Sequence, residues 1–257
     1  MNSSGDAIKL QQISTRLSSI PWLKLKLFEE ATSTMDLARN ISSELGQNEV
    51  GMALTLRQTN GRGRLGRTWL DTEGAFLGTL VHCTNLDISK YSGFSLAVGL
   101  MISNVLLHFG VNTNLKWPND VMDQESRKLG GVLIELNKQD RTSYISTGIG
   151  INLRNAPDNF QFASSVWNSS GHEIEISDFT YFLLTEFKLL IEEFDQKGFK
   201  GFKDDWKKKA IKVSEKVKIS YQGKTAEGIF RDVNNEGAIL LDVDGKIMEV
   251  SSGEITI

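Results

Sequence analysis

Apolar positions recur with two different periods along the chain and predict a mixture of helices and strands. Apolar residues at helical spacing predict buried helices at 94–106 and 179–194, with a further helix after Gly198. Short β-prone runs predict strands at residues 52–57, 75–83, 129–136 and 144–153. Ser33 and Thr34 predict the start of another helix, because hydroxyl side chains can cap its first free N–H groups. Helices and strands do not strictly alternate, which favours an α+β fold.

The pattern changes near residue 212. From Val213 onward, short alternating strands are separated by turn signals such as Gln222-Gly223 and Asp244-Gly245. These last residues, about 45 in number, predict a second, small β domain. We therefore expect a larger domain at residues 1–212, which begins with a polar lead-in at residues 1–20, and a small domain at residues 213–257.

Composition and charge exclude several classes of protein. The formal net charge of −3 gives no sign of a nucleic-acid partner, and a single cysteine, Cys83, excludes an internal disulfide framework. Residues 91–115 carry no fixed charge, but polar residues and glycines interrupt them, so we expect a buried helix and no membrane span. The polar start lacks the pattern of a signal peptide, so we expect a cytoplasmic protein.

The loop Gln58-Thr59-Asn60-Gly61-Arg62-Gly63-Arg64-Leu65-Gly66-Arg67-Thr68-Trp69 is the strongest chemical signal in the sequence. Its glycines let the backbone approach a ligand, and its arginines match phosphate or carboxylate oxygens. The alternative is a solvated turn of the kind found in disordered nucleic-acid-binding tails. The β-prone runs on both sides favour an ordered anion-binding loop, although no Gly-Lys-Ser/Thr phosphate-loop ending is present.

The run Lys116-Trp117-Pro118-Asn119-Asp120 places a lysine, an amide and a carboxylate where a strand ends. In such a place Lys116 can steady a phosphate, and Asp120 can hold a magnesium ion that neutralises triphosphate charge. The alternative is a Pro-Asn-Asp turn without a function. Spacing alone does not decide between them.

Two glycine-containing strands form a third signal. Lys128 directly precedes Gly130-Gly131, and paired glycines inside an apolar strand suggest that another group passes close by. The run 148–152 has small residues on one face and ends in Asn152, which can read the edge of a base. The alternative for Lys128 is a strand-entry lysine beside a β-bulge.

Together these motifs, in this order and preceded by Ser33-Thr34, resemble biotin–protein ligases over roughly residues 25–257. The resemblance implies an α+β fold: a mixed-sheet catalytic domain of the biotin/lipoate ligase type, followed by a small SH3-like β barrel. It implies that ATP activates biotin as biotinyl-5′-AMP, with Mg²⁺. Biotin then passes to a lysine of a biotin carboxyl carrier protein domain, as in acetyl-CoA carboxylase.

The resemblance also implies residue roles. Catalysis would involve Arg62, Lys116, Asp120 and Lys128. Biotin would be bound by Ser33, Thr34, Met35, Gln58, Arg62, Gly63, Arg64 and Lys128. The nucleotide would be bound by Arg64, Arg67, Trp69, Lys116, Asn119 and Asn152, and Mg²⁺ by Asp120. Met35 departs from the pattern, because many relatives carry an amide there. No enzyme nucleophile is required, so we expect Cys83 to serve core packing.

Partners follow from the same resemblance. Some family members carry an N-terminal DNA-binding domain, but only about 25 residues precede the ligase core here, so we expect no DNA partner. A homodimer and a monomer both stay open.

Two other functions compete with this one. A lipoate– or octanoate–protein ligase shares the fold class, but none of the three histidines is followed by the Asp expected there. A non-enzymatic nucleic-acid-binding module could use the arginine loop and the lysine-rich segment 197–212. Residues 213–257 carry more acidic than basic side chains, which is the wrong sign for such a module.

Overall fold

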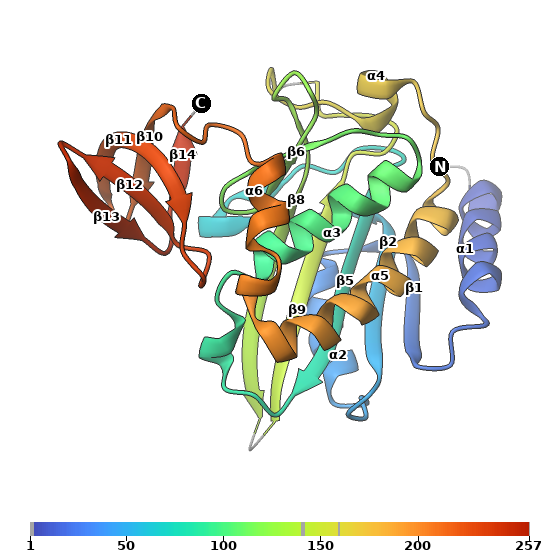
Figure 1. The fold of residues 1–257 in the computed structure, drawn as a ribbon. Helices are drawn as coiled ribbons and strands as arrows, with labels where there is room; N and C mark the ends of the chain where they lie inside the picture. The colour runs from blue at the N-terminus through green and yellow to red at the C-terminus, as the bar shows by residue number, and fades with distance from the viewer. Residues whose placement is uncertain (1–2, 140–141, 159, 257) are drawn as a thin grey trace.

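The computed structural model describes residues 3–139, 142–158 and 160–256. Figure 1 shows a large mixed sheet covered by helices and, beside it, a smaller sheet formed by the C-terminal part of the chain.

Seven strands form the large sheet, of which β1 and β2 are parallel and all other neighbours are antiparallel. Their order across the sheet is β1 (Leu23–Ala31), β2 (Val50–Gln58), β5 (Phe76–Thr84), β9 (Thr142–Ile151), β8 (Lys128–Gln139), β7 (Asp120–Met122) and β6 (Asn114–Lys116). The four predicted strands are therefore confirmed as β2, β5, β8 and β9, and the mixed sheet confirms the α+β fold class.

Helices lie on both faces of this sheet (Figure 1). One face is covered by α3 (Phe94–His108) and α5 (Ile176–Lys197), and α2 (Thr34–Ser42) lies on the other. Smaller elements are β3 (Gly61–Arg62), η1 (Arg64–Gly66), β4 (Thr68–Trp69), η2 (Ile88–Tyr91), α4 (Val166–Ser170), η3 (Phe199–Gly201) and α6 (Lys203–Lys209). No helix in the described parts of the chain is long and apolar enough to cross a membrane.

Aromatic side chains fill the core between the sheet and its two long helices. The ring centroids of Phe76 on β5 and Phe179 on α5 lie 5.1 Å apart, and those of Phe94 and Phe194 lie 4.8 Å apart. Offset and edge-to-face aromatic pairs add stability beyond the burial of their surface. The apolar stripes predicted at 94–106 and 179–194 are therefore the core faces of α3 and α5.

Two elements at the N-terminal end, α1 and β1, were not predicted from the sequence. The lead-in, described above as polar, forms α1 (Ser3–Leu17), and its Ile13 and Leu17 are only 1% and 2% exposed. Arg16 pairs with Asp178 of α5 at 2.8 Å. Only a few apolar residues of α1 contact the core, so the sequence of this helix is mostly polar and shows no clear apolar stripe.

The C-terminal strands form a five-stranded antiparallel sheet, which is SH3-like. Its order is β13 (Lys246–Val250), β12 (Ile239–Val243), β11 (Lys224–Val233), β10 (Lys216–Tyr221) and β14 (Glu254–Thr256). The indole Nε1 of Trp117 donates a hydrogen bond to the carbonyl of Gly237 at 2.9 Å, which connects this sheet to the larger one. The division of the chain at residues 212 and 213 stays a prediction.

Candidate active site

The glycine- and arginine-rich segment forms an ordered loop. Gly61 pairs with Trp69 and Arg62 with Thr68, so β3 and β4 make a short antiparallel ladder that closes around η1. A Cβ atom on Gly61 would lie 2.7 Å from the carbonyl oxygen of Trp69, too close for any side chain. At the tip, Leu65 has a φ of 56°. This geometry shows why Gly61 must be a glycine, and the binding of an anion by the loop stays a prediction.

A cavity of about 390 Å³ opens beneath this loop. Its lining residues are Ser33, Thr34, Met35, Gln58, Arg62, Gly63, Arg64, Arg67, Thr68, Trp69, Leu70, Asn119, Asp120, Lys128, Gly131, Val132, Leu133, Gly148, Ile149, Gly150, Asn152, Pro157, Phe160 and Ala163. Every residue predicted for the site is in this set except Lys116. The motifs, although far apart in the sequence, thus converge on one cavity.

One end of the cavity is polar and uncharged. Ser33 caps α2, as predicted, and its hydroxyl accepts a hydrogen bond from the N–H of Met35. The Oε1 atom of Gln58 accepts hydrogen bonds from Thr34 N at 2.8 Å and Thr34 Oγ1 at 3.3 Å. Thr79 Oγ1 donates to Thr34 Oγ1 at 2.8 Å. The hydrogen bonds fix the hydroxyl and amide groups before a ligand arrives.

Met35 borders this polar end and packs on β9. Its side chain is 3% exposed, and a Cβ atom on Gly148 would lie 2.7 Å from its sulfur. The glycine at this position of β9 therefore makes room for the thioether.

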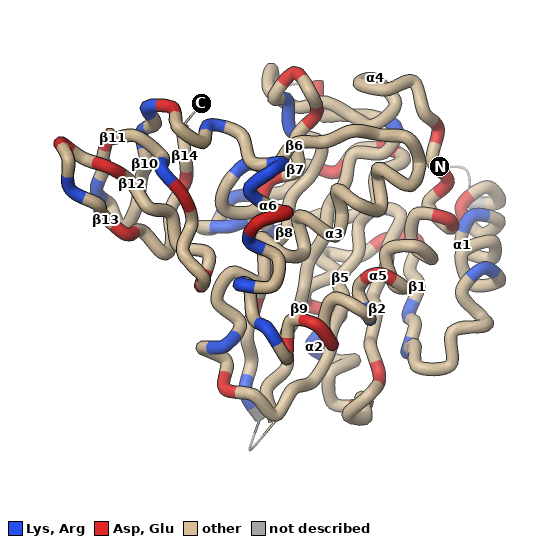
Figure 2. The backbone as a smooth tube through the Cα atoms, viewed as in Figure 1, with Lys and Arg blue, Asp and Glu red and all other residues tan. Residues whose placement is uncertain are grey.

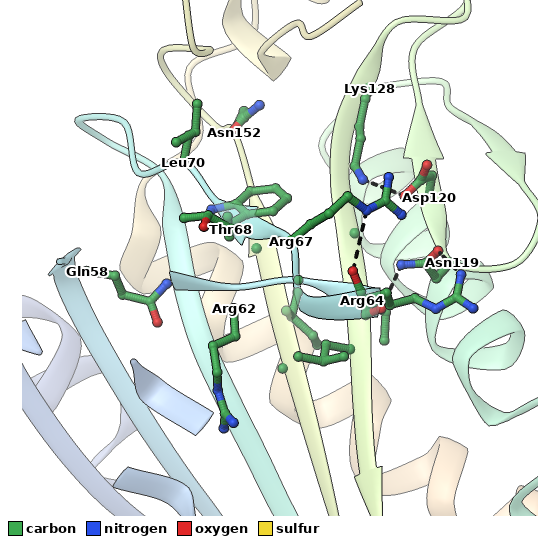
Figure 3. Close-up of a pocket in the computed structure, with 18 of the residues that line it drawn as sticks. Gln58, Arg62, Arg64, Arg67, Thr68, Leu70, Asn119, Asp120, Lys128 and Asn152 are labelled. Carbon is green, nitrogen blue, oxygen red and sulfur yellow. Dashed lines mark hydrogen bonds and ion pairs between the residues drawn. The ribbon is translucent and has the colours of Figure 1, made fainter. Parts of the chain in front are cut away.

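The opposite end of the cavity is charged (Figure 3). The Lys128 ammonium lies 2.6 Å from Asp120 Oδ1. Arg64 Nη1 donates to Asn119 Oδ1 and to the carbonyl of Gly253, each at 3.2 Å. Burial lowers the pKa of Arg64, although an arginine stays protonated at any physiological pH.

The C-terminal sheet contributes to this charged end. Arg67 Nη1 pairs with Glu254 Oε1 at 2.8 Å, next to the contact between Arg64 and the Gly253 carbonyl. Two arginines of the loop are thus tied to the strand β14 region. These contacts bring residues almost 190 positions apart in the sequence to the same site.

Lys116 lies beside the cavity. It pairs with Asp120 across the β6–β7 hairpin, in which Trp117-Pro118 is a cis peptide. Burial lowers the pKa of Lys116, whereas the charge of Asp120 opposes that shift. The predicted run at 116–120 is therefore a hairpin connection that also carries two cavity residues, Asn119 and Asp120.

Arg62 makes different contacts from Arg64 and Arg67. Its guanidinium pairs with Asp36 Oδ1 at 3.1 Å and with Glu135 Oε1 at 3.2 Å. Figure 3 shows its side chain directed away from the other two arginines and from Lys128. In this structure Arg62 anchors the loop to α2 and β8, and its predicted catalytic role stays a prediction.

Trp69 and Asn152 line a third part of the cavity. Trp69 lies over Gly150, where a Cβ atom would be 2.7 Å from the indole ring. Asn152 is 3% exposed, and its Nδ2 donates to the carbonyl of Ser164 at 3.1 Å. Asn152 Oδ1 and Trp69 Nε1 are buried and have no hydrogen-bond partner among the described residues. Buried polar atoms are normally paired, and these two belong to cavity-lining residues, so they are available to a ligand. Nε and Nη2 of Arg62, which lines the same cavity, are likewise buried without a hydrogen-bond partner among the described residues.

Several lining residues were missed from the sequence. Leu70, Pro157, Phe160 and Ala163 lie in connecting segments that carry no motif. Ala163 comes to the cavity because it forms a parallel bridge with Lys128. Phe160 is 58% exposed although it is a large apolar residue, and no pattern in the sequence predicted this exposure.

A metal ion has limited possibilities for binding here. The described residues contain no group of three or more His, Cys, Asp or Glu side chains that could hold one. Magnesium bound with a nucleotide uses one or two carboxylates together with phosphate oxygens and water. A single carboxylate, that of Asp120, is enough for a magnesium ion that arrives bound to a nucleotide. It is not enough for an ion that only protein side chains hold.

Comparison with known proteins identifies the family. The model of the Biotin/lipoate A/B protein ligase family matches residues 27–152, and that of the Biotin protein ligase C terminal domain matches residues 215–257. The chain belongs to the biotin protein ligase family. It is 28% identical over 244 residues to the Biotin--[acetyl-CoA-carboxylase] ligase of Mycobacterium tuberculosis, covering 91% of this chain and 89% of that protein.

A second relative and a solved structure show a similar likeness. The Bifunctional ligase/repressor BirA of Escherichia coli is 30% identical over 215 residues, and the match covers 78% of this chain and 64% of that protein. The chain therefore spans less than two thirds of that relative. The structure of the biotin protein ligase from Aquifex aeolicus in complex with biotin and ATP has a TM-score of 0.76 and 28% identity, over 91% of this chain and 97% of that one.

Proposed function

We propose that this chain activates biotin with ATP to form biotinyl-5′-AMP and then transfers biotin to a lysine of a carrier protein. The observation that carries the proposal is the single cavity in which a neutral hydrogen-bonding end meets a cationic end. The first suits the polar head of biotin, and the second suits a carboxylate and phosphates that must be brought together. Family membership and the likeness to a ligase with bound biotin and ATP support it.

In the first step a carboxylate oxygen of biotin forms a bond to the α-phosphorus of ATP, and the bond to pyrophosphate breaks. Both reactants are anions, so their approach requires positive charge. Lys128 and Arg64, which both line the charged end of the cavity, would supply it. We propose that Lys128 exchanges Asp120 for the reacting oxygens, while Arg64 exchanges its neutral partners for phosphate.

Magnesium would neutralise the phosphates of ATP, with Asp120 as its protein ligand. The nucleotide base would form hydrogen bonds with Asn152 Oδ1 and Trp69 Nε1, which have no other partner among the described residues. These assignments rest on the donor chemistry of the residues present.

In the second step the uncharged amine of a carrier lysine attacks the acyl carbon of the adenylate, and AMP leaves. The acceptor we propose is a biotin carboxyl carrier protein domain, in keeping with the names of the relatives. The absence of a DNA partner and a cytoplasmic location stay predictions, and a homodimer and a monomer both stay open.

Pyrophosphate–ATP exchange tests the proposal, because it reports the first step without a carrier. Purified protein with magnesium should catalyse exchange with biotin, and not with lipoate or octanoate. Absence of exchange would be followed by mass spectrometry for a retained adenylate, and absence of both would refute the proposal.

A lipoate– or octanoate–protein ligase is the second candidate, because the matched family model also includes lipoate ligases. Exchange with lipoate or octanoate alone would favour it.

A nucleic-acid-binding module has less support. Two lysines of α6, Lys203 and Lys207, pair with Asp232 of the C-terminal sheet at 3.4 and 3.2 Å, and Lys208 pairs with Asp205. In Figure 2 the cationic segments of α6 are accordingly interrupted by anionic ones. Several of these lysines thus bind protein carboxylates and are not free for phosphates.

A further inference from the structure

Asp71 lies directly after the glycine–arginine loop, two residues beyond the end of β4. The chain leaves the large sheet after Gln58 at the end of β2 and enters it again at Phe76, the start of β5. Asp71 Oδ2 accepts a hydrogen bond from the backbone N–H of Gln58 at 2.9 Å. The side chain therefore joins the two ends of the loop, beyond the last paired residues of β3 and β4.

The hydrogen bonds continue from Gln58 into the neutral end of the cavity. Gln58 Oε1 accepts from the N–H and the hydroxyl of Thr34. Its Nε2 is on the side of the loop, 3.1 Å from the position that a Cβ atom on Gly61 would take. The carboxamide is thus oriented, with its oxygen toward α2 and its nitrogen toward the loop (Figure 3).

Asp71 is a partly buried carboxylate. Its Oδ1 atom is buried and has no hydrogen-bond partner among the described residues, and none of their ion pairs includes Asp71. The neighbouring cation, Arg57, already pairs with Asp6 at 2.6 Å and Glu30 at 3.5 Å. Burial raises the pKa of Asp71, and the backbone N–H groups of Gln58 and Thr72 and the charge of Arg57 oppose that shift. A carboxylate oxygen buried without a hydrogen-bond partner is costly, so the place of Asp71 beside Gln58 needs an explanation beyond general stability.

We propose that Asp71 is a positioning residue, which closes the loop on Gln58 and so holds the Gln58 carboxamide in the orientation that binds biotin. The inference rests on the proposed function, because it concerns the biotin end of the same cavity. Asp71 does not touch the substrate; it acts through the backbone of Gln58.

The test compares Asp71→Ala, Asp71→Asn and the control Glu73→Ala in pyrophosphate exchange. Asp71→Ala removes the acceptor and should raise the KM for biotin about 10-fold to 100-fold, the range for a lost hydrogen bond to a charged group. The KM for ATP should change less than about 3-fold. Asp71→Asn keeps an acceptor oxygen and should stay within about 3-fold of wild type. Glu73 is exposed on the same segment, and its loss should have no effect.

A double-mutant cycle with Gln58→Ala separates positioning from folding. In a Gln58→Ala background, adding Asp71→Ala should raise the KM for biotin less than about 2-fold. Calorimetric titration with biotin in the absence of ATP should give, for each variant, the same ratio to wild type in Kd as exchange kinetics give in KM. Asp71→Leu, which is close in shape and has no acceptor, replaces Asp71→Ala if that variant does not fold.

Three results would overturn the inference while the proposed function stands: an unchanged biotin KM in Asp71→Ala, an equal loss in Asp71→Asn, or full additivity with Gln58→Ala. Wild-type protein that neither binds biotin nor catalyses exchange with it would overturn both. Wild-type protein that binds biotin without exchange still allows the comparison of Kd values.

Discussion

At the start of α2 the cavity is lined by neutral groups of Thr34 and Gln58 that are hydrogen-bonded to each other, with the ion-paired Arg62 beside them, whereas near β7 the lining groups are charged. Thr34 is 4% exposed and bonds to Gln58 and Thr79. Lys128, by contrast, is 38% exposed at its side chain and pairs with Asp120. The neutral end is therefore formed before binding, whereas the charged end must exchange protein partners for those of the substrate.

This difference predicts different consequences of mutation. Removing a neutral group leaves its partners in place and costs a hydrogen bond, which affects binding. Removing a cation that meets charge developing in the transition state affects the chemical step.

Lys128→Ala should have the largest effect. It removes the cation that we place at the biotin carboxylate and the α-phosphate, so the rate of pyrophosphate exchange should fall about 1000-fold or more. Circular dichroism should show a folded protein, because the side chain is partly exposed. Lys138→Ala, on the exposed side of the same strand, is the control and should keep full activity. Activity retained by Lys128→Ala would remove this residue from the catalytic group.

Thr34→Val tests the neutral end. The substitution keeps the shape of the side chain and deletes the hydroxyl that bonds to Gln58 and Thr79, so the KM for biotin should rise about 10-fold. The KM for ATP should stay within about 2-fold. Thr185→Val, on an exposed position of α5, is the control. A rise in the KM for ATP of the same size would show that the two ends are not separate.

Ionic strength should distinguish the ends without any mutation. Salt screens partly exposed charges, so raising NaCl from about 50 to about 500 mM should raise the KM for ATP about 3-fold to 5-fold. The KM for biotin should change less, because hydrogen bonds between neutral groups are not screened. Equal changes of both KM values would contradict the comparison.

The neutral end of the cavity could be predicted from the sequence more completely than the charged end, and the reason is physical. Periodicity and capping are local properties, so the helix start at Ser33 and the four strands were readable from neighbouring residues. The contact of Arg64 with Gly253 was not, because it depends on how the C-terminal sheet packs. The same holds for Asp71, which has no motif and gains its place only when the loop returns to Gln58.

The N-terminal part of the chain teaches a second lesson. Leucine and lysine alternate at the start of β1, which is a strand signal, although it is short and weaker than the motifs elsewhere in the sequence. In α1, few apolar residues meet the core, so no clear stripe marks the helix. Partial burial thus hides elements that lie at the margin of a domain.

Glu135→Gln should have the smallest effect and tests what holds Arg62. The side chain of Glu135 is 25% exposed and pairs with both Arg62 and Arg39. Partly exposed ion pairs of this kind contribute little to stability. Exchange activity should therefore fall about 2-fold to 5-fold. Arg62→Gln should give a loss of the same size if Arg62 anchors the loop to α2 and β8. A loss of about 100-fold in Arg62→Gln alone would show instead that the guanidinium leaves its carboxylates and acts on the substrate, as the family resemblance implies.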